Sequence, residues 1–305
     1  NLPLTKALVG CMDDWNELDH FDPTVHTRRI FKRFFQLREV YGVLQDGFGL
    51  RTMRKWTRSV YRPGSNGTAT ETGAWLITRE ELTGFQNVTG QFRGPVLLMY
   101  TNENTTTSYT FPCKGRDSIL TPFTLSAAGS TVRNLFYPYE TYTLQDSGEP
   151  SPGRAGATLG CIPSVTLAPY GFKAFVPASQ WVAPAPAITK FTPGHDHRMD
   201  STSVSANVPV TLEFNTPMTC TSVTNSISFR FTGKGSAPTI SNVNCAPIEN
   251  PDPNPIPGGD VSAWSWSATL QGVPEGITVM TVTNPSSPGN GTTGVSSRPL
   301  LMRHR

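Results

Sequence analysis

The N-terminal part of the chain has a pattern of apolar positions that predicts one amphipathic helix. The sequence Asp-Pro-Thr at 22–24 provides a capping acceptor followed by proline, and both are typical of a helix start. Four apolar residues then recur at spacings of three and four, on one helical face: Ile30, Phe34, Leu37 and Tyr41. Phe31 and Phe35 widen this stripe, and basic residues cover much of the rest: Arg28, Arg29, Lys32, Arg33 and Arg38. We therefore predict a helix over 23–41 of about five turns, which ends at Gly42 and buries its aromatic face.

After Trp56 the pattern changes to short apolar runs separated by turn residues. The runs are rich in β-branched and aromatic side chains, and Gly, Pro, Asn and Ser cluster between them, as is typical of antiparallel strands. Seven strands are predicted before residue 181: 58–61, 73–78, 95–101, 107–111, 132–136, 141–144 and 171–176. Seven more are predicted after residue 187: 188–191, 208–214, 226–231, 239–243, 263–270, 277–282 and 300–303.

These patterns predict a mainly β chain with two sandwich domains. Residues 57–180 are expected to form an antiparallel sheet domain, and seven strands over 188–305 are typical of an immunoglobulin-like β-sandwich. The Pro-rich stretch 181–187 is expected to be a stiff linker. Residues 1–56 contribute an irregular segment and the helix. The length of 305 residues fits two domains and part of a third.

Composition narrows the classes of function. Lys and Arg number 25 against 22 Asp and Glu, a formal net charge of +3, and these charges are spread evenly along the chain. Because no basic stripe is available to neutralise phosphates, nucleic acid is not expected as a partner. No apolar run approaches the ~18 residues of a transmembrane helix, so no membrane segment is expected in this chain. No signal-peptide pattern follows Asn1, and we expect any targeting segment to lie upstream or to have been removed.

The asparagine and cysteine patterns favour an extracellular protein. Four N-x-Ser/Thr acceptor sequences predict N-glycosylation at Asn66, Asn87, Asn104 and Asn290. In an oxidising compartment the cysteines are expected to pair, and local pairing joins Cys113 to Cys161 and Cys220 to Cys245. Cys11 is then unpaired, and two interpretations stay open: a buried free thiol, or a partner in a part of the protein that this chain lacks.

Three clusters could carry chemistry, and a structural interpretation is favoured for each. A glycosidase needs two carboxyl groups facing each other across a sugar, and the acidic run 13–19 does not guarantee that geometry. The favoured interpretation is a solvated loop whose acids stabilise the positive N-terminal end of the following helix. The run 195–197 (HDH) has no evident third ligand, so no metal site is predicted. Trp264 and Trp266 share one face of a strand, where core packing is favoured over a sugar-stacking platform. The sequence has no nucleotide-binding or other cofactor motif, and no cofactor is predicted.

Longer strings along most of the chain resemble fungal cell-wall α-1,3-glucan synthases. The strings are long and stand in the order that the family has: 13–23 (DDWNELDHFDP), 44–48 (LQDGF), 62–68 (RPGSNGT), 100–105 (YTNENT), 134–140 (NLFYPYE), 190–196 (KFTPGHD) and 263–268 (AWSWSA). Proteins of this family have a large extracellular region similar to α-amylase, in which a (β/α)₈ barrel is followed by β modules. A membrane segment and a cytoplasmic sugar-nucleotide transferase come later in those proteins.

The resemblance implies a fold assignment for each part of the chain. Residues 23–41 would be the last helix of the barrel, 57–180 its C-terminal β domain and 188–305 an Ig-like module. The three acidic catalytic positions of amylases would lie upstream, in a missing barrel segment, so no catalytic residue is assigned to this chain. The loop before the helix would open at the catalytic face of the barrel, where four residues would line the cleft: Asp13, Asp14, Trp15 and His20.

The resemblance also implies a function. The chain would be a non-catalytic portion that supports an amylase-like transglycosylase or hydrolase, whose expected mechanism is retaining chemistry through a carboxylate pair. The expected partner of the intact protein is α-glucan or a maltooligosaccharide, and the expected location is the cell wall or the outer face of the plasma membrane. The alternative is a stand-alone carbohydrate-binding or structural module of the cell wall.

Overall fold

The computed structural model describes most of both predicted domains. The described residues are 26–47, 49–61, 63–80, 94–114, 123–150, 156, 158–183, 186–194, 197–199, 205–248, 262–283, 285–288, 291–292 and 300–304. They are mainly β and divide into two compact units, one around Arg33–Pro184 and the other around Ala185–Glu249 and Ser262–Arg305. Each unit is described below by itself. No helix in these ranges is long and apolar enough to span a membrane.

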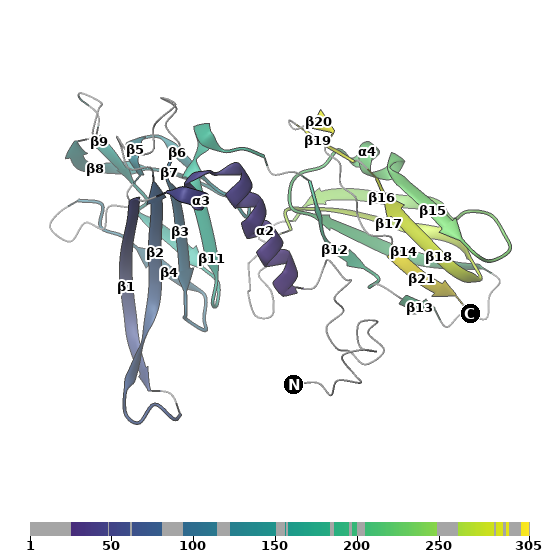
Figure 1. Ribbon diagram of the computed structural model, residues 1–305, viewed down its shortest axis with the longest axis horizontal. Coiled ribbons are helices and arrows are strands. Elements are labelled where there is room, and N and C mark those ends of the chain that lie inside the picture. Colours follow the sequence, from purple (N-terminus) through teal and green to yellow (C-terminus); the bar gives the residue numbers. More distant parts are fainter. Residues whose placement is uncertain are drawn as a thin grey trace. The chain divides into compact units, whose positions relative to one another are not determined.

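The first domain is built on one large antiparallel sheet (Figure 1). Its strand order is β1 (Gly49–Tyr61), β2 (Ala69–Glu80), β3 (Val96–Thr101), β11 (Phe172–Pro177), β6 (Thr131–Asn134) and β7 (Thr141–Thr143). Smaller antiparallel sheets pair β10 (Ser164–Leu167) with β4 (Thr107–Thr110), and β9 (Thr158–Cys161) with β5 (Phe123–Ala127) and β8 (Gln145–Pro150). A short 3₁₀ helix, η2 (Ala178–Gln180), follows β11.

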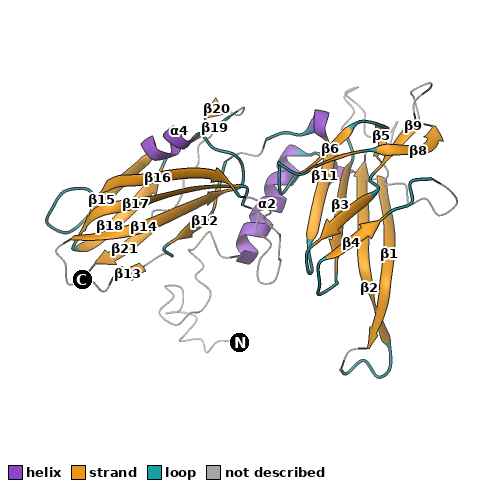
Figure 2. Ribbon diagram, turned by 180° about the vertical axis from the view of Figure 1, so that it is seen from behind, coloured by secondary structure: helices purple, strands orange, loops and turns teal. Residues whose placement is uncertain are grey.

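The central strands of the large sheet are covered on both faces. Successive side chains of a strand point to opposite faces, so a strand covered in this way contributes to two cores. On β3, Leu97 and Met99 join a core with residues of β4 and β10, among them Tyr109, Val165 and Leu167. Val96 and Leu98 point to the other face, which is covered by the helix α2 (His26–Val40) and the short α3 (Val43–Asp46). Figure 2 shows α2 beside this sheet from the opposite side. The predicted helix is therefore present and packs on the first β domain.

The structure corrects the prediction for the surface of this helix. Phe34 contacts the rings of Phe136 and Phe172, with centroids 5.3 and 5.7 Å apart. Phe31 and Phe35 were expected to be buried, but they are 60% and 59% exposed. The basic Arg33 was expected on the outer face and is only 3% exposed. A periodic pattern gives the direction of each side chain around the helix axis, whereas the width of the covered face depends on the neighbouring sheet.

Two long-range hydrogen bonds attach α2 and the residue that follows it, Tyr41, to the domain. The Nη2 atom of Arg33 donates to the carbonyl oxygen of Leu135 at 2.6 Å, and the backbone N–H of Val182 donates to the hydroxyl of Tyr41 at 3.0 Å. Burial lowers the pKa of Arg33 to about 10, although nearby Tyr41 acts in the opposite direction. Desolvation of a cation is costly, so α2 is held in one specific position by a polar contact as well as by its apolar face.

Strand β1 starts earlier than predicted, at Gly49, so the boundary expected between 56 and 57 falls inside this strand. Its register with β2 shifts between Trp56 and Arg58. Four basic residues also interrupt its apolar positions: Arg51, Arg54, Lys55 and Arg58. Charged side chains are typical of an edge strand, where they oppose pairing with another chain. The even alternation that reveals a strand in the sequence is therefore lost here.

The second domain is a two-sheet sandwich. One sheet has the order β12 (Ile188–Thr192), β14 (Ser205–Phe214), β17 (Trp264–Pro274) and β16 (Thr239–Pro247). The other has the order β13 (His197–Met199), β21 (Leu300–His304), β18 (Gly276–Val282) and β15 (Ile227–Phe231), in which only the β13–β21 pair is parallel. Short elements complete the domain: α4 (Cys220–Asn225), β19 (Ser286–Ser287) and β20 (Gly291–Thr292). All seven strands predicted for this domain are present, and the expected Ig-like sandwich is confirmed.

Candidate functional site

Several residues singled out in the sequence lie outside the described ranges. These are the four residues expected to line a cleft, the unpaired cysteine, two acceptor asparagines and two residues of the His-Asp-His run: Asp13, Asp14, Trp15, His20, Cys11, Asn87, Asn290, His195 and Asp196. Within the described part of the chain, no group of three or more His, Cys, Asp or Glu side chains is arranged to hold a metal ion.

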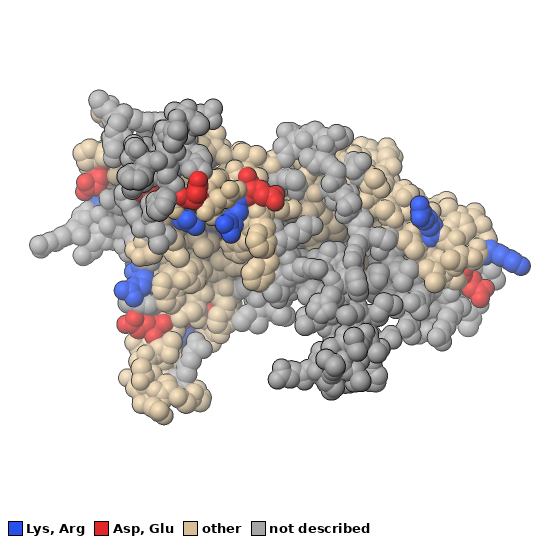
Figure 3. Space-filling view, in the orientation of Figure 1, with Lys and Arg blue, Asp and Glu red and all other residues tan. Residues whose placement is uncertain are grey.

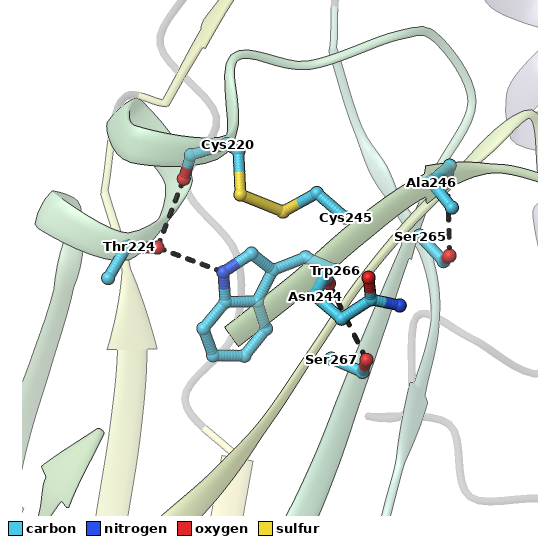
Figure 4. Close-up of a disulfide and its surroundings, with 8 residues drawn as sticks. All are labelled: Cys220, Thr224, Asn244, Cys245, Ala246, Ser265, Trp266 and Ser267. Atoms are coloured by element: carbon cyan, nitrogen blue, oxygen red, sulfur yellow. Dashed lines mark hydrogen bonds between the residues drawn. A yellow bond between two sulfur atoms is a disulfide. The ribbon is translucent and has the colours of Figure 1, made fainter. Parts of the chain in front are cut away.

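The two tryptophans of β17 lie in the core of the second domain. Trp266 is fully buried and Trp264 is 6% exposed. The indole N–H of Trp266 donates to the Thr224 hydroxyl at 3.0 Å, and that hydroxyl donates to the carbonyl oxygen of Cys220 at 3.0 Å (Figure 4). Neither indole face is available to a sugar, so the favoured core interpretation holds and the sugar-stacking hypothesis is wrong for this pair.

Both disulfides expected from the sequence are present, one in each domain. Cys113 is bonded to Cys161, and Cys220 is bonded to Cys245. The second bond joins α4 to β16 directly beside Trp266 (Figure 4). The two bonds join cysteines that are 48 and 25 residues apart in the sequence. A disulfide that closes a loop of this length stabilises the folded state by roughly 3–4 kcal/mol, because it lowers the entropy of the unfolded chain.

A buried carboxylate, Glu103, organises one end of the large sheet in the first domain. It is 3% exposed and lies in the loop between β3 and β4. Its Oε1 accepts hydrogen bonds from the hydroxyls of Thr57 and Thr72, the latter at 2.9 Å. Its Oε2 accepts from Nη2 of Arg58 at 3.1 Å and from Nε at 3.3 Å. Arg58 also donates to Oδ1 of Asn104 at 3.2 Å, so one cation links the buried acid to an exposed loop.

The electrostatics of this cluster favour the ionised acid. Burial acts to raise the pKa of Glu103, but hydrogen bonds from Thr57, Thr72 and Arg58, with the positive charge of Arg58, outweigh it. The resulting pKa lies below the usual value of a glutamic acid. A general acid needs the opposite shift, towards neutral pH. Glu103 therefore has the environment of a structural carboxylate.

A second carboxylate, Glu140, is satisfied in the same way at the start of β7. Its Oε1 pairs with the ammonium group of Lys173 and accepts from the Tyr142 hydroxyl at 2.7 Å. Its Oε2 accepts from the side-chain amide of Asn134 at 2.6 Å. Burial and the bond to Glu140 raise the pKa of Tyr142, so this phenol stays protonated. Both carboxylates are thus held by donors, and among the described residues no second carboxylate is bonded into either cluster.

Sequence reasoning did not single out these two clusters, although a signal was present. Glu103 lies in the string 100–105 and Glu140 lies in the string 134–140, both of which carry the family resemblance. No role was assigned to either acid, because their partners are distant in the sequence: Arg58 is 45 residues before Glu103, and Lys173 is 33 residues after Glu140. Among the described residues on the face that Figure 3 shows, basic and acidic side chains are interspersed and form no large area of a single sign.

Two of the four predicted acceptor asparagines are described. Asn66 is exposed at the turn between β1 and β2. β3 pairs with β2 only over Ala74–Arg79, so the end of the β1–β2 hairpin that carries this turn extends beyond β3 (Figure 1). Asn104 is exposed in the loop between β3 and β4. Both positions are at the surface of the first domain, where a modification needs no change of the core.

The described residues therefore form two β domains, and in the first the buried Glu103 and the half-buried Glu140 are satisfied by hydrogen bonds. Comparison with known families agrees, because a Mok13-like GH beta-sandwich domain matches residues 48–181 and a Mok13 Ig-like beta-sandwich domain matches residues 183–304. Two Schizosaccharomyces pombe proteins are similar over nearly the whole chain. Cell wall alpha-1,3-glucan synthase mok13 is 34% identical over 90% of this chain, and mok12 is 32% identical over 99%. The chain belongs to the family of cell-wall α-1,3-glucan synthases.

The match covers a small part of these relatives. The chain spans 12% of the length of mok13 and 13% of the length of mok12. A third relative in the same organism, mok11, is 31% identical over 94% of the chain, which again spans 12% of that protein. The activity of the whole synthase is therefore a property of much longer proteins.

Proposed function

We propose that this chain is the non-catalytic β-domain portion of a secreted fungal α-1,3-glucan synthase. In this role it supports and positions an amylase-like transglycosylase or hydrolase region that makes or remodels α-glucan of the cell wall. The proposed location is the cell wall or the outer face of the plasma membrane. The glucan chain, or a maltooligosaccharide, would be bound by the intact protein, with the catalytic carboxylates on an upstream barrel segment.

The observation that carries this proposal is the environment of two acids, the buried Glu103 and the half-buried Glu140. A glycosidase active site needs an acid and a second carboxylate on opposite sides of a sugar, about 5–10 Å apart. Glu103 and Glu140 instead accept hydrogen bonds at both oxygens within separate clusters. Two disulfides support an oxidising, extracellular environment for the chain.

The alternative is a stand-alone carbohydrate-binding or structural module of the cell wall, and its carbohydrate-binding form loses the one sugar-binding feature that the sequence offered. This form rested on Trp264 and Trp266, and burial removes both rings from contact with a ligand. The two hypotheses are separated by incubating the purified chain with α-1,3-glucan and maltooligosaccharides. We expect neither product nor micromolar binding. Detected product would contradict the claim that this chain lacks the catalytic carboxylates, and detected micromolar binding would contradict a purely supporting role.

A second test uses the full-length synthase. Glu103→Gln and Glu140→Gln should each leave the amount of α-glucan made per folded molecule unchanged, because these acids act on the stability of the first domain. The measurement is cell-wall α-glucan divided by the amount of protease-resistant synthase. Loss of a catalytic carboxylate would reduce this ratio by orders of magnitude, and such a loss with normal folding would show that the acid is catalytic.

A further inference from the structure

Two neighbouring asparagines in the loop after β3 have opposite environments. Asn102 uses both ends of its amide for the backbone of β2: Nδ2 donates to the carbonyl oxygen of Glu71 at 3.0 Å, and Oδ1 accepts from the N–H of Gly73 at 2.9 Å. Asn104 is exposed, and its Oδ1 accepts from Arg58. The first amide thus extends the hydrogen bonding of the sheet beyond the end of β3, whereas the second is bonded, among the described residues, through its oxygen.

The contact with Arg58 sets the orientation of the Asn104 amide. A guanidinium group has only donors, so the amide atom that faces it must be the oxygen. The same Arg58 is held by the buried carboxylate of Glu103, the residue immediately before Asn104. Since Oδ1 and Nδ2 diverge from one carbon, an oxygen fixed towards Arg58 leaves Nδ2 directed away from it, on an exposed side chain.

We propose that Asn104 carries an N-linked glycan on Nδ2. The acceptor sequence is Asn104-Thr105-Thr106, and all three residues are exposed. The proposal rests on the secreted location in the proposed function, since the transfer needs a lipid-linked oligosaccharide diphosphate and a separate transferase of the secretory pathway. The bond from C1 of the first sugar to Nδ2 forms as the bond from C1 to the diphosphate oxygen breaks. Nδ2 loses one proton, and the lipid diphosphate leaves with the bonding electron pair.

The fold accommodates this modification without the loss of a hydrogen bond. Among the described residues, no hydrogen-bond partner of Nδ2 of Asn104 would be lost on glycosylation, and the bond from Arg58 to Oδ1 can remain. The same substitution at Asn102 would remove or distort its bond to β2, and the third residue of Asn102-Glu103-Asn104 is not a hydroxyl residue. The chain therefore offers its own matched pair, with one asparagine built into the sheet and one presented to the transferase.

The experiment is a site-by-site measurement of glycan occupancy. The chain is secreted from a yeast host, treated with an amidase that releases N-glycans in ¹⁸O-labelled water, and digested for mass spectrometry. An occupied asparagine becomes labelled aspartate. We expect label at Asn104 in most molecules. A largely unlabelled Asn104 in a secreted chain that carries label at another acceptor site would overturn the proposal.

Three variants exclude a structural explanation. Thr106→Ala destroys the acceptor sequence while the asparagine remains, so we expect the label at Asn104 and the mass of one glycan to be lost. Thr105→Ala changes a neighbouring exposed threonine but preserves the sequence, and its occupancy should equal that of the parent chain. Asn102→Gln should also leave the occupancy of Asn104 unchanged. Retention of the label in Thr106→Ala would contradict the assignment, and none of these readouts depends on glucan synthesis.

Discussion

The two domains of this chain bury their strands by different means. In the first, one sheet is covered on one face by α2 and on the other by smaller sheets, and charged groups are enclosed: Arg33, Glu103 and the half-buried pair Glu140 and Lys173. In the second, two sheets enclose an apolar core, and the fully buried polar residues among those described are uncharged: Thr189, Asn215, Thr216, Ser262, Thr278 and Ser287. A half-buried carboxylate is present there too, Glu213 paired with the more exposed Lys190, but no charged group in the described part of this domain is as deeply enclosed as Arg33 or Glu103. We therefore expect the stability of the second domain to depend mainly on how well its apolar core is filled, whereas the stability of the first domain should depend on pH as well.

The largest expected effect comes from the core of the second domain. Trp266→Ala should destabilise this domain by about 3–5 kcal/mol, because it leaves a large cavity beneath the disulfide between Cys220 and Cys245. Hydrogen exchange measured peptide by peptide in denaturant reports each domain separately. Exchange should accelerate in β14 and β17 and stay unchanged in β2 and β3. Equal acceleration in both domains would show that they unfold as one unit and would break the comparison.

A smaller effect is expected where α2 meets the first domain. Leu37→Ala removes a side chain that is 3% exposed and should cost about 3 kcal/mol. Phe35→Ala, on the exposed side of the same helix, should change the stability by less than about 0.5 kcal/mol. Urea unfolding of the purified chain checks both values. A larger loss in Phe35→Ala than in Leu37→Ala would mean that the helix is covered by its other face.

The smallest effect is the pH dependence of the first domain. The folded pKa of Glu103 lies below its ordinary value, so its contribution is present above the unfolded pKa of about 4.3 and is lost as pH falls through the folded pKa. Glu103→Gln should cost about 1.5–3 kcal/mol at pH 7 and should flatten the acid side of the stability curve.

Asn104→Gln serves as the control for this pH experiment, because the same loop is changed while the buried acid remains. Its acid transition should keep the parent midpoint and slope in thermal unfolding measured from pH 7 to pH 3. If Glu103→Gln also retained the full acid transition, the buried acid would not be the titrating group that distinguishes the first domain.

The sequence predicted buried positions correctly where a periodic pattern of apolar residues was uninterrupted. The alternation around Trp264 and Trp266 correctly indicated two core positions, and the spacing of Phe34, Leu37 and Tyr41 correctly indicated the buried stripe of α2. Reasoning failed where a pattern was interrupted or was not local. Basic residues obscured the first half of β1, and Arg33 was assigned to the outer face of its helix because it is basic, although its spacing from Ile30 and Leu37 places it beside the apolar stripe.

The sequence by itself thus determined the mainly β class of both domains, the helix before them, the two disulfide pairs and the family, but not every element, since β5, β8, β9, β10 and α4 were not predicted. Periodicity, cysteine spacing and long family strings are all readable along the chain, without knowledge of what lies across from them. Only the tertiary structure decided which charges meet and which faces are covered. Thr57 and Thr72 are 46 and 31 residues away from Glu103. The three residues form one cluster because the β1–β2–β3 register brings their strands side by side. The free energy of an enclosed charge depends on such partners, and no local pattern in the sequence specifies them.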